Sequence, residues 1–237
     1  MQTLKQYFLF PTITVITVEL LLSFYGCTKN PGNQGKELVL FYDVPLECGA
    51  APDLGCGSRA KPVFLEMEQY KNIKEAWLNR QGTVIAVIGG PSTSDWKQLN
   101  EIIKPIFTKY DVSATYVENL KRQNEFMSDF RTDGKWYKGV DVDKLSLEEA
   151  IRLAESAVTF AKNAKLIDEP EAQAIRSDVE SYMKQDLVKV RTYDELCASE
   201  ESRYDAVYNI YQKHIGKERA EKVRKIYEEH QPEEHAE

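Results

Sequence analysis

Histidine and cysteine are scarce in this chain of 237 residues, which contains three histidines and four cysteines. The histidines, His214, His230 and His235, all lie near the C-terminal end. The first 200 residues therefore offer no imidazole for acid–base catalysis or metal binding. Four cysteines are too few for the disulfide framework of a small secreted domain. The glycine-containing turn at residues 89–92 is not a phosphate-binding loop, since no GxxxxGK[ST] or GxGxxG pattern is present.

Basic residues are outnumbered as well, with 31 Lys and Arg against 38 Asp and Glu, so the formal net charge is −7. A nucleic-acid-binding protein normally presents a basic face, and this charge argues against that class. Hydrophobic residues make up 42% and charged residues 29% of the chain, which is an ordinary composition for a soluble body. The length suggests one or two domains of roughly 100–200 residues each.

The N-terminal segment has the order of an export signal. Lys5 supplies a short basic region, residues 7–26 are mainly apolar, and the small residue Gly26 precedes Cys27. This order resembles a bacterial lipoprotein signal. The resemblance implies that residues 1–27 are a signal or anchor segment, that Cys27 carries the lipid, and that the bacterial membrane is a partner.

Two other interpretations of this segment stay open. One is an uncleaved anchor, although Glu19 would be costly inside a bilayer. The other is a start codon placed too early on a cytoplasmic protein. Residues 28–35 are rich in Gly, Asn and Pro and predict a flexible tether. The expected location is thus outside the cytoplasm, held beside a membrane.

Residues 36–120 alternate short apolar runs, which predict strands, with apolar residues at helical spacing. The expected order is a strand at 36–43, a loop at 44–57, a helix at 58–71, strands at 74–79 and 83–89, a helix at 95–110 and a strand at 112–119. Ser58 is the expected N-cap of the first helix. Pro105 is expected to kink or shorten the second helix.

A βαββαβ order is typical of the ferredoxin-like fold, in which two helices cover one face of a four-stranded antiparallel sheet. The expected class is α+β, with a ferredoxin-like domain at 36–120 followed by a small all-α domain at 145–230. A polar joint at 121–144 would connect the two, and residues 231–237 would be a tail.

Four helices are expected in the all-α domain. Ser146 and Glu149 have the spacing of a capping box at the start of the first helix, and the second helix starts near Asp168. The third is expected at 201–215 and the fourth at 217–229. Such a helical half is suited to docking a protein partner.

Cys48 and Cys56 are the residues most suited to chemistry, because both lie in the loop at 44–57. Cys56 directly precedes a predicted helix, and Arg59 and Lys61 lie in its first turn. Helix N-termini and nearby cations favour thiolate over thiol. Two thiolates can hold Cu(I) or another soft metal ion. A structural disulfide, a redox-active pair and inert thiols are the alternatives.

The stretch 56–87, with its helix and following hairpin, resembles the heavy-metal-associated (HMA) domain of copper chaperones and metal-transport ATPases. The resemblance covers residues 36–119 and implies a ferredoxin-like fold and soft-metal binding at the first strand–helix loop. The family motif is Met-x-Cys-x-x-Cys. Cys56 falls on its first cysteine and Arg59 on its second, so Cys48 would have to supply the second thiol.

The leading functional prediction is a membrane-tethered, non-enzymatic protein that holds a soft metal ion or a thiol-reactive ligand at Cys48 and Cys56. Arg59 and Lys61 would tune the thiolates. One alternative is thiol–disulfide exchange. The other is an assembly module in which a Cys48–Cys56 disulfide staples the loop and the helical half docks a partner.

The remaining candidates favour structural roles. Cys197 is expected to be a small, buried or half-buried thiol. Trp136 and Tyr137 lie between two glycines and are expected to cap the joint between the domains. Asp141 and Asp143 lack the ligand spacing of a calcium loop and are expected to be solvated.

Overall fold

The computed structural model describes residues 37–49, 51–93 and 95–230, and by its contacts the chain from Glu37 onward forms one unit. The predicted signal segment at 1–27, the tether at 28–35 and the tail at 231–237 lie outside the described residues. Within the described ranges, no helix combines the length and the apolar character that a membrane span requires.

A five-stranded antiparallel sheet organises the first part of the unit, and its spatial order is β6-β1-β5-β4-β7. The strands are β1 (Val39–Asp43), β4 (Ile73–Asn79), β5 (Val84–Gly89), β6 (Thr115–Tyr116) and β7 (Trp136–Lys138). The central strand β5 pairs with β1 on one side and with β4 on the other. The α+β class predicted from the sequence is confirmed, since helices follow this sheet along the chain.

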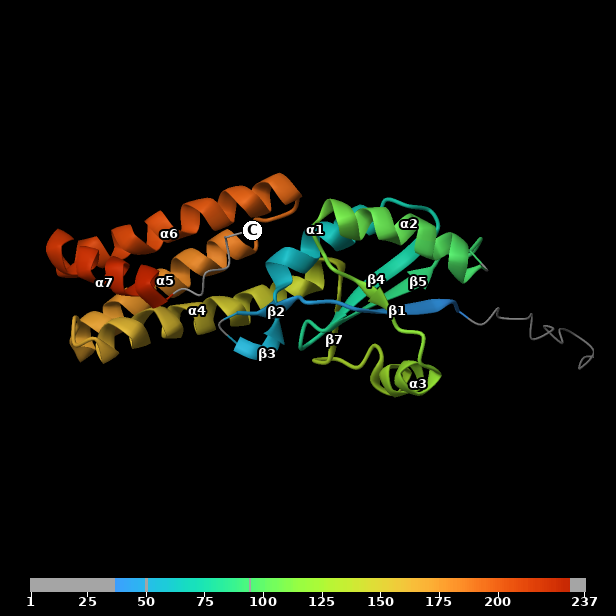
Figure 1. Ribbon diagram of the computed structural model, residues 1–237, viewed down its shortest axis with the longest axis horizontal. Helices are drawn as coiled ribbons and strands as arrows, with labels where there is room; N and C mark the ends of the chain where they lie inside the picture. Colours follow the sequence, from blue (N-terminus) through green and yellow to red (C-terminus); the bar gives the residue numbers. More distant parts are fainter. Residues whose placement is uncertain (1–36, 50, 94, 231–237) are drawn as a thin grey trace, which may run out of the picture. The chain divides into compact units, whose positions relative to one another are not determined.

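Both faces of the sheet are covered, because successive side chains of a strand point to opposite sides. Leu40 and Tyr42 pack into the cluster formed with α1 (Gly57–Met67) and α2 (Trp96–Lys109). Phe41 packs on the other face against Phe126 of α3 (Leu120–Asp129). Figure 1 shows α1 and α2 on one side of the sheet and α3 on the other.

Several predicted boundaries in this part were wrong. The expected loop at 44–57 contains a small hairpin of β2 (Glu47–Cys48) and β3 (Ala51–Gly55). The expected N-cap Ser58 lies inside α1, whose N-cap is Cys56. Pro105 does not shorten α2. The strand expected at 112–119 is reduced to the two residues of β6.

The segment expected as a polar joint, 121–144, contains ordered elements instead. It includes most of α3, all of β7 and a short 3₁₀ helix at Gly139–Val142. Trp136 is buried beneath the sheet with Phe41 and Phe130, and Tyr137 belongs to the cluster on the opposite face. These aromatic residues belong to a fifth strand and do not cap a joint.

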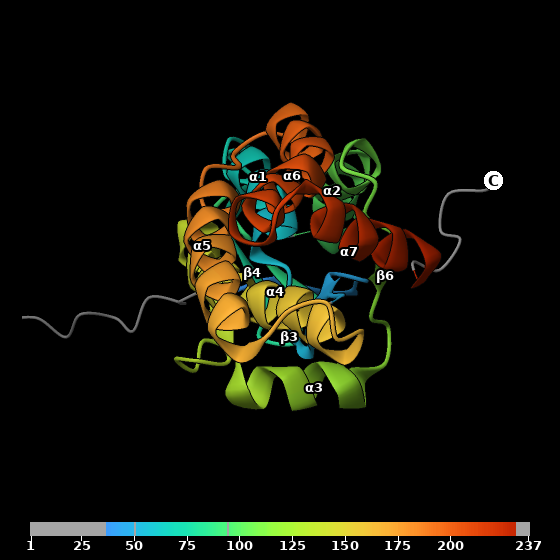
Figure 2. The same cartoon turned by 90° about the vertical axis from the view of Figure 1, so that its left-hand side faces the viewer.

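Four helices follow, as predicted. They are α4 (Asp143–Asn163), α5 (Glu169–Leu187), α6 (Tyr193–Ile215) and α7 (Lys217–His230), and they pack together around their own apolar cluster (Figure 2). Two starts differ from prediction. α4 begins at Asp143, so Ser146 and Glu149 lie inside the helix and do not cap it. Both side chains are buried. α6 begins eight residues before the predicted Glu201, at a capping box of Thr192 and Glu195.

A buried lysine connects the sheet part to these helices. The side chain of Lys61 on α1 is fully buried. Its Nζ donates to Asp143 Oδ1 at 2.8 Å, at the start of α4, and to the carbonyl oxygen of Val188 at 2.7 Å, at the end of α5. A buried ammonium is stable only when it is paired and hydrogen-bonded. Asp143, expected to be solvated, is therefore an anchor for Lys61.

Replacing Lys61 should destabilise the fold strongly. In Lys61→Met, the Asp143 carboxylate and the Val188 carbonyl lose their donor, so we expect the free energy of unfolding to fall by about 3–5 kcal/mol. Urea denaturation measures it. Lys74→Met is the control, because Lys74 forms an exposed pair with Glu37 and should cost under about 1 kcal/mol. Equal losses in the two variants would contradict the anchoring role.

Candidate functional site

The β2–β3 hairpin and the start of α1 bring the two predicted cysteines into one buried region. Cys48 lies in β2, where it pairs with Ala51, and Cys56 is the N-cap of α1. The Cys56 backbone N–H donates to the Leu46 carbonyl at 2.7 Å, which fixes its place beside the hairpin. Both sulfurs are thiols, and their residues are 3% and 7% exposed.

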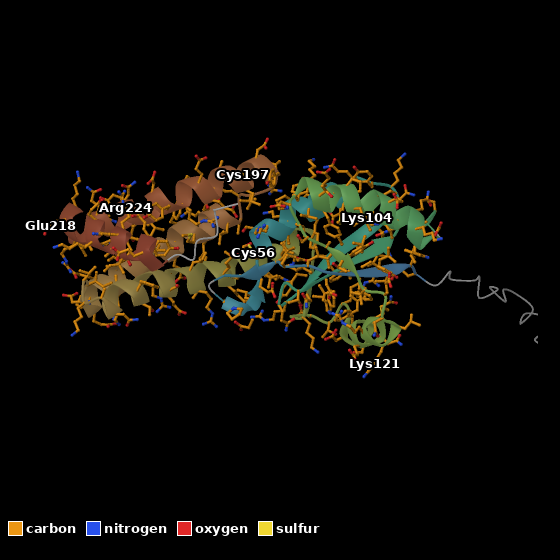
Figure 3. The ribbon with its side chains drawn as sticks, in the orientation of Figure 1. Cys56, Lys104, Lys121, Cys197, Glu218 and Arg224 are labelled. Carbon is orange, nitrogen blue, oxygen red and sulfur yellow. The ribbon has the colours of Figure 1, made fainter. Side chains whose placement is uncertain are left out.

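Close packing of Gly57 sets α1 against the start of α4. A Cβ atom at Gly57 would lie 2.2 Å from the Val142 carbonyl oxygen and 2.5 Å from Ser146 Oγ. A residue with any side chain would therefore push the two helices apart. Because the next turn of α4 carries Glu149, this contact brings its carboxylate to Cys56. Figure 3 shows Cys56 where α1 starts, close to α4.

Glu149 is the residue that sequence reasoning missed. The Cys56 thiol donates to Glu149 Oε1 at a sulfur–oxygen distance of 3.4 Å, and Ser58 Oγ lies 3.4 Å from the same sulfur. A hydrogen bond from Cys48 also acts on the Glu149 carboxylate. The two thiols thus share one buried carboxylate, which comes from a helix almost 100 residues later in the chain.

Burial controls the protonation of this cluster. It raises the pKa of Glu149 to about 7, although the two thiols and the charge of Arg203 act in the opposite direction. Burial also raises the pKa of Cys56, and the negative charge of Glu149 adds to that effect. The expected preference for thiolate was wrong, because burial outweighs the helix N-terminus. At neutral pH, Cys56 is a thiol.

The two predicted tuning cations act differently from expectation. Arg59 acts on Cys56 through its backbone, which lowers the pKa of the thiol against the effect of burial. The ammonium of Lys61 binds Asp143 and the Val188 carbonyl. It therefore fixes α1 against α4. Cys197, expected to be at least half-buried, is exposed on α6, and Figure 3 shows it apart from Cys56.

Two buried polar atoms beside the thiols have no hydrogen-bond partner among the described residues. They are Glu149 Oε2 and Ser146 Oγ, which lie one helical turn apart on α4. Buried polar atoms are seldom left unpaired in native proteins. These atoms can accept a hydrogen bond from a ligand or from water. The site thus has two hydrogen-bond acceptors that its own side chains leave unused.

The comparisons with known proteins leave the site to be judged on its geometry. No family model, curated protein or solved structure matches the chain. In the part of the chain that the structure describes, no group of three or more His, Cys, Asp or Glu side chains is arranged to hold a metal ion. The structure places two thiols, those of Cys48 and Cys56, beside one carboxylate, that of Glu149. These three side chains are here called the dithiol–carboxylate site.

Glu149 should make stability depend on pH. Its folded pKa of about 7 lies above the ordinary 4.5, so the folded protein holds a proton that the unfolded chain releases between these values. The free energy of unfolding should therefore fall as pH rises through this window, by about 3 kcal/mol at ~1.4 kcal/mol per pKa unit. In Glu149→Gln, urea denaturation between pH 5 and pH 8 should show no such fall in the free energy of unfolding.

The neighbouring Glu148→Gln serves as the matched control. Glu148 is partly exposed, and its hydrogen bond from Arg80 lowers its pKa. Its stabilising effect is present above the unfolded pKa and is lost only as the pH falls below it. The wild-type decline should thus persist in Glu148→Gln. A Glu149→Gln profile parallel to that of the wild type would show that Glu149 is not buried as described.

Proposed function

We propose that the protein binds a soft metal ion, Cu(I) or an ion of similar chemistry, or another thiol-reactive ligand, through Cys48 and Cys56. The observation that carries this proposal is that both thiols reach one buried carboxylate, Glu149. Two sulfurs are enough for a linear Cu(I) complex, and thiolates are the ligands that soft ions prefer. The orphaned oxygens of Glu149 and Ser146 leave polar atoms available at the same place.

Charge balance supports a monovalent ion at this site. With Glu149 ionised, two neutral thiols and one carboxylate carry one negative charge. Binding a monovalent cation to two thiolates releases two protons, and Glu149 can take up one of them because its pKa is about 7. The second proton leaves to solvent. The bound state then also carries one negative charge, so no additional buried charge has to be desolvated.

We also infer a ferredoxin-like plan for the sheet part, as the resemblance to the HMA domain implies. Its support is the order β6-β1-β5-β4, with α1 between β1 and β4 in sequence and α2 between β5 and β6. In this plan, Cys56 occupies the start of the first helix, and β7 is an added edge strand. Cross-strand nuclear Overhauser effects test it: β1 lying beside a strand other than β5 and β6 would exclude the plan.

A Cu(I) titration against a competing chelator tests the proposed function. The full-length protein is used in a Cys27→Ser background, so that Cys27 cannot bind the ion. We expect one Cu(I) per chain, and affinity at least about 100-fold weaker in Cys48→Ser and Cys56→Ser, since each loses one of two thiolate ligands. Cys197→Ser is the matched control, because that cysteine is exposed and lies on α6; its affinity should be unchanged.

Thiol–disulfide exchange is the second candidate, and Glu149 as a proton acceptor beside Cys56 favours it. In this reaction Cys48 and Cys56 lose two protons and two electrons to form a disulfide, while a partner disulfide is reduced to two thiols. Weak Cu(I) binding together with a disulfide that forms and opens reversibly in glutathione buffers would replace the metal proposal by this one. Stoichiometric Cu(I) binding that survives in Cys48→Ser/Cys56→Ser would contradict the metal proposal for this pair, and a pair that forms no disulfide in these buffers would exclude thiol–disulfide exchange.

A further inference from the structure

A second site lies among the four helices α4 to α7, built from residues other than Cys48, Cys56 and Glu149. It is a pocket of about 300 Å³, at the lower end of the range for small-molecule sites. Its walls are mainly apolar and aromatic, with side chains from all four helices: Leu153, Phe160, Met183, Val207, Val223 and Tyr227. Figure 3 labels Arg224 of α7, which also lines it.

One wall of the pocket carries a guanidinium group that is only partly used. Arg203 Nη2 donates to Ser199 Oγ at 2.8 Å, and its distance to Asp186 Oδ2 is 3.5 Å. Arg203 Nε is buried and has no hydrogen-bond partner among the described residues. The side chain as a whole is 20% exposed, so other atoms of the guanidinium are accessible from the pocket.

The charged side chains of the lining favour an anion. Arg203 and Arg224 line the pocket together with one acidic residue, Glu200. Arg224 is already paired, since it lies 3.1 Å from Glu221 and 3.6 Å from Glu228. Arg203 is paired less closely, since its Nη2 lies 3.5 Å from Asp186 Oδ2 and that oxygen also accepts a 2.5 Å hydrogen bond from Ser199.

We propose that this pocket binds a small amphiphile with an apolar chain and a carboxylate, the carboxylate pairing with the accessible part of the Arg203 guanidinium. The volume sets the size of the molecule. At ~30 Å³ for each water-sized atom, the pocket holds about ten non-hydrogen atoms, the number in an eight-carbon carboxylate. The apolar walls contact the chain, and the guanidinium forms a charge-assisted hydrogen bond with the carboxylate.

Calorimetric titration of the full-length protein with octanoate and with 1-octanol tests the proposal. The two probes share the chain and differ in charge, so octanoate should bind about tenfold more tightly or better, as expected for a charge-assisted hydrogen bond. In Arg203→Gln this preference should fall to within about twofold. In Val207→Trp, where an indole fills the pocket, binding of both probes should be lost.

The control is Leu147→Trp, which adds the same indole to α4 at an exposed position outside the pocket and should bind both probes as the wild type does. Ala157→Leu, also in the lining, replaces Val207→Trp if that variant fails to fold. The proposal is overturned by equal affinity for the two probes in the wild type, by absence of octanoate binding, or by binding that survives in the filled variants.

Discussion

The ammonium of Lys61 is the constraint on which the arrangement of this protein depends. It is fully buried, and its three hydrogen bonds go to both Asp143 oxygens and to the Val188 carbonyl. Desolvating a lysine is costly unless every donor is satisfied. The start of α4 and the end of α5 must therefore stay where they are relative to α1. The close contact of Gly57 with α4 completes this restraint.

The dithiol–carboxylate site follows from that geometry. Glu149 lies on α4, six residues after Asp143. Because Asp143 is held against α1, the Glu149 carboxylate reaches Cys56. Burial raises the pKa of the Glu149 carboxyl group above its ordinary value. Burial also raises the pKa of Cys56, and the charge of Glu149 adds to that effect. Each group thus controls the protonation of the other.

The sequence predicted the sheet better than the site. β1, β4 and β5 were found because their apolar runs are bounded by turn formers, and α2 because its apolar face is periodic. β7 was missed because its three residues lie among polar and glycine residues and become a strand only by pairing with β4. Glu149 was mistaken for a capping residue, although it shares the buried side of α4 with Leu145 and Ala150. A charged residue on an apolar helix face was the available signal. The raised pKa of Cys56 could not be predicted, because its cause is burial by a distant helix.

The most direct test of this account is the pKa of the Glu149 carboxyl group, measured by ¹³C NMR in the wild type and in Cys48→Ala and Cys56→Ala. We expect a value of about 7 in the wild type. It should rise in each variant, because each removes a thiol that donates to the carboxylate. A value near the ordinary 4.5 that neither substitution changes would contradict the account, since the two thiols and the carboxylate would then not form one site.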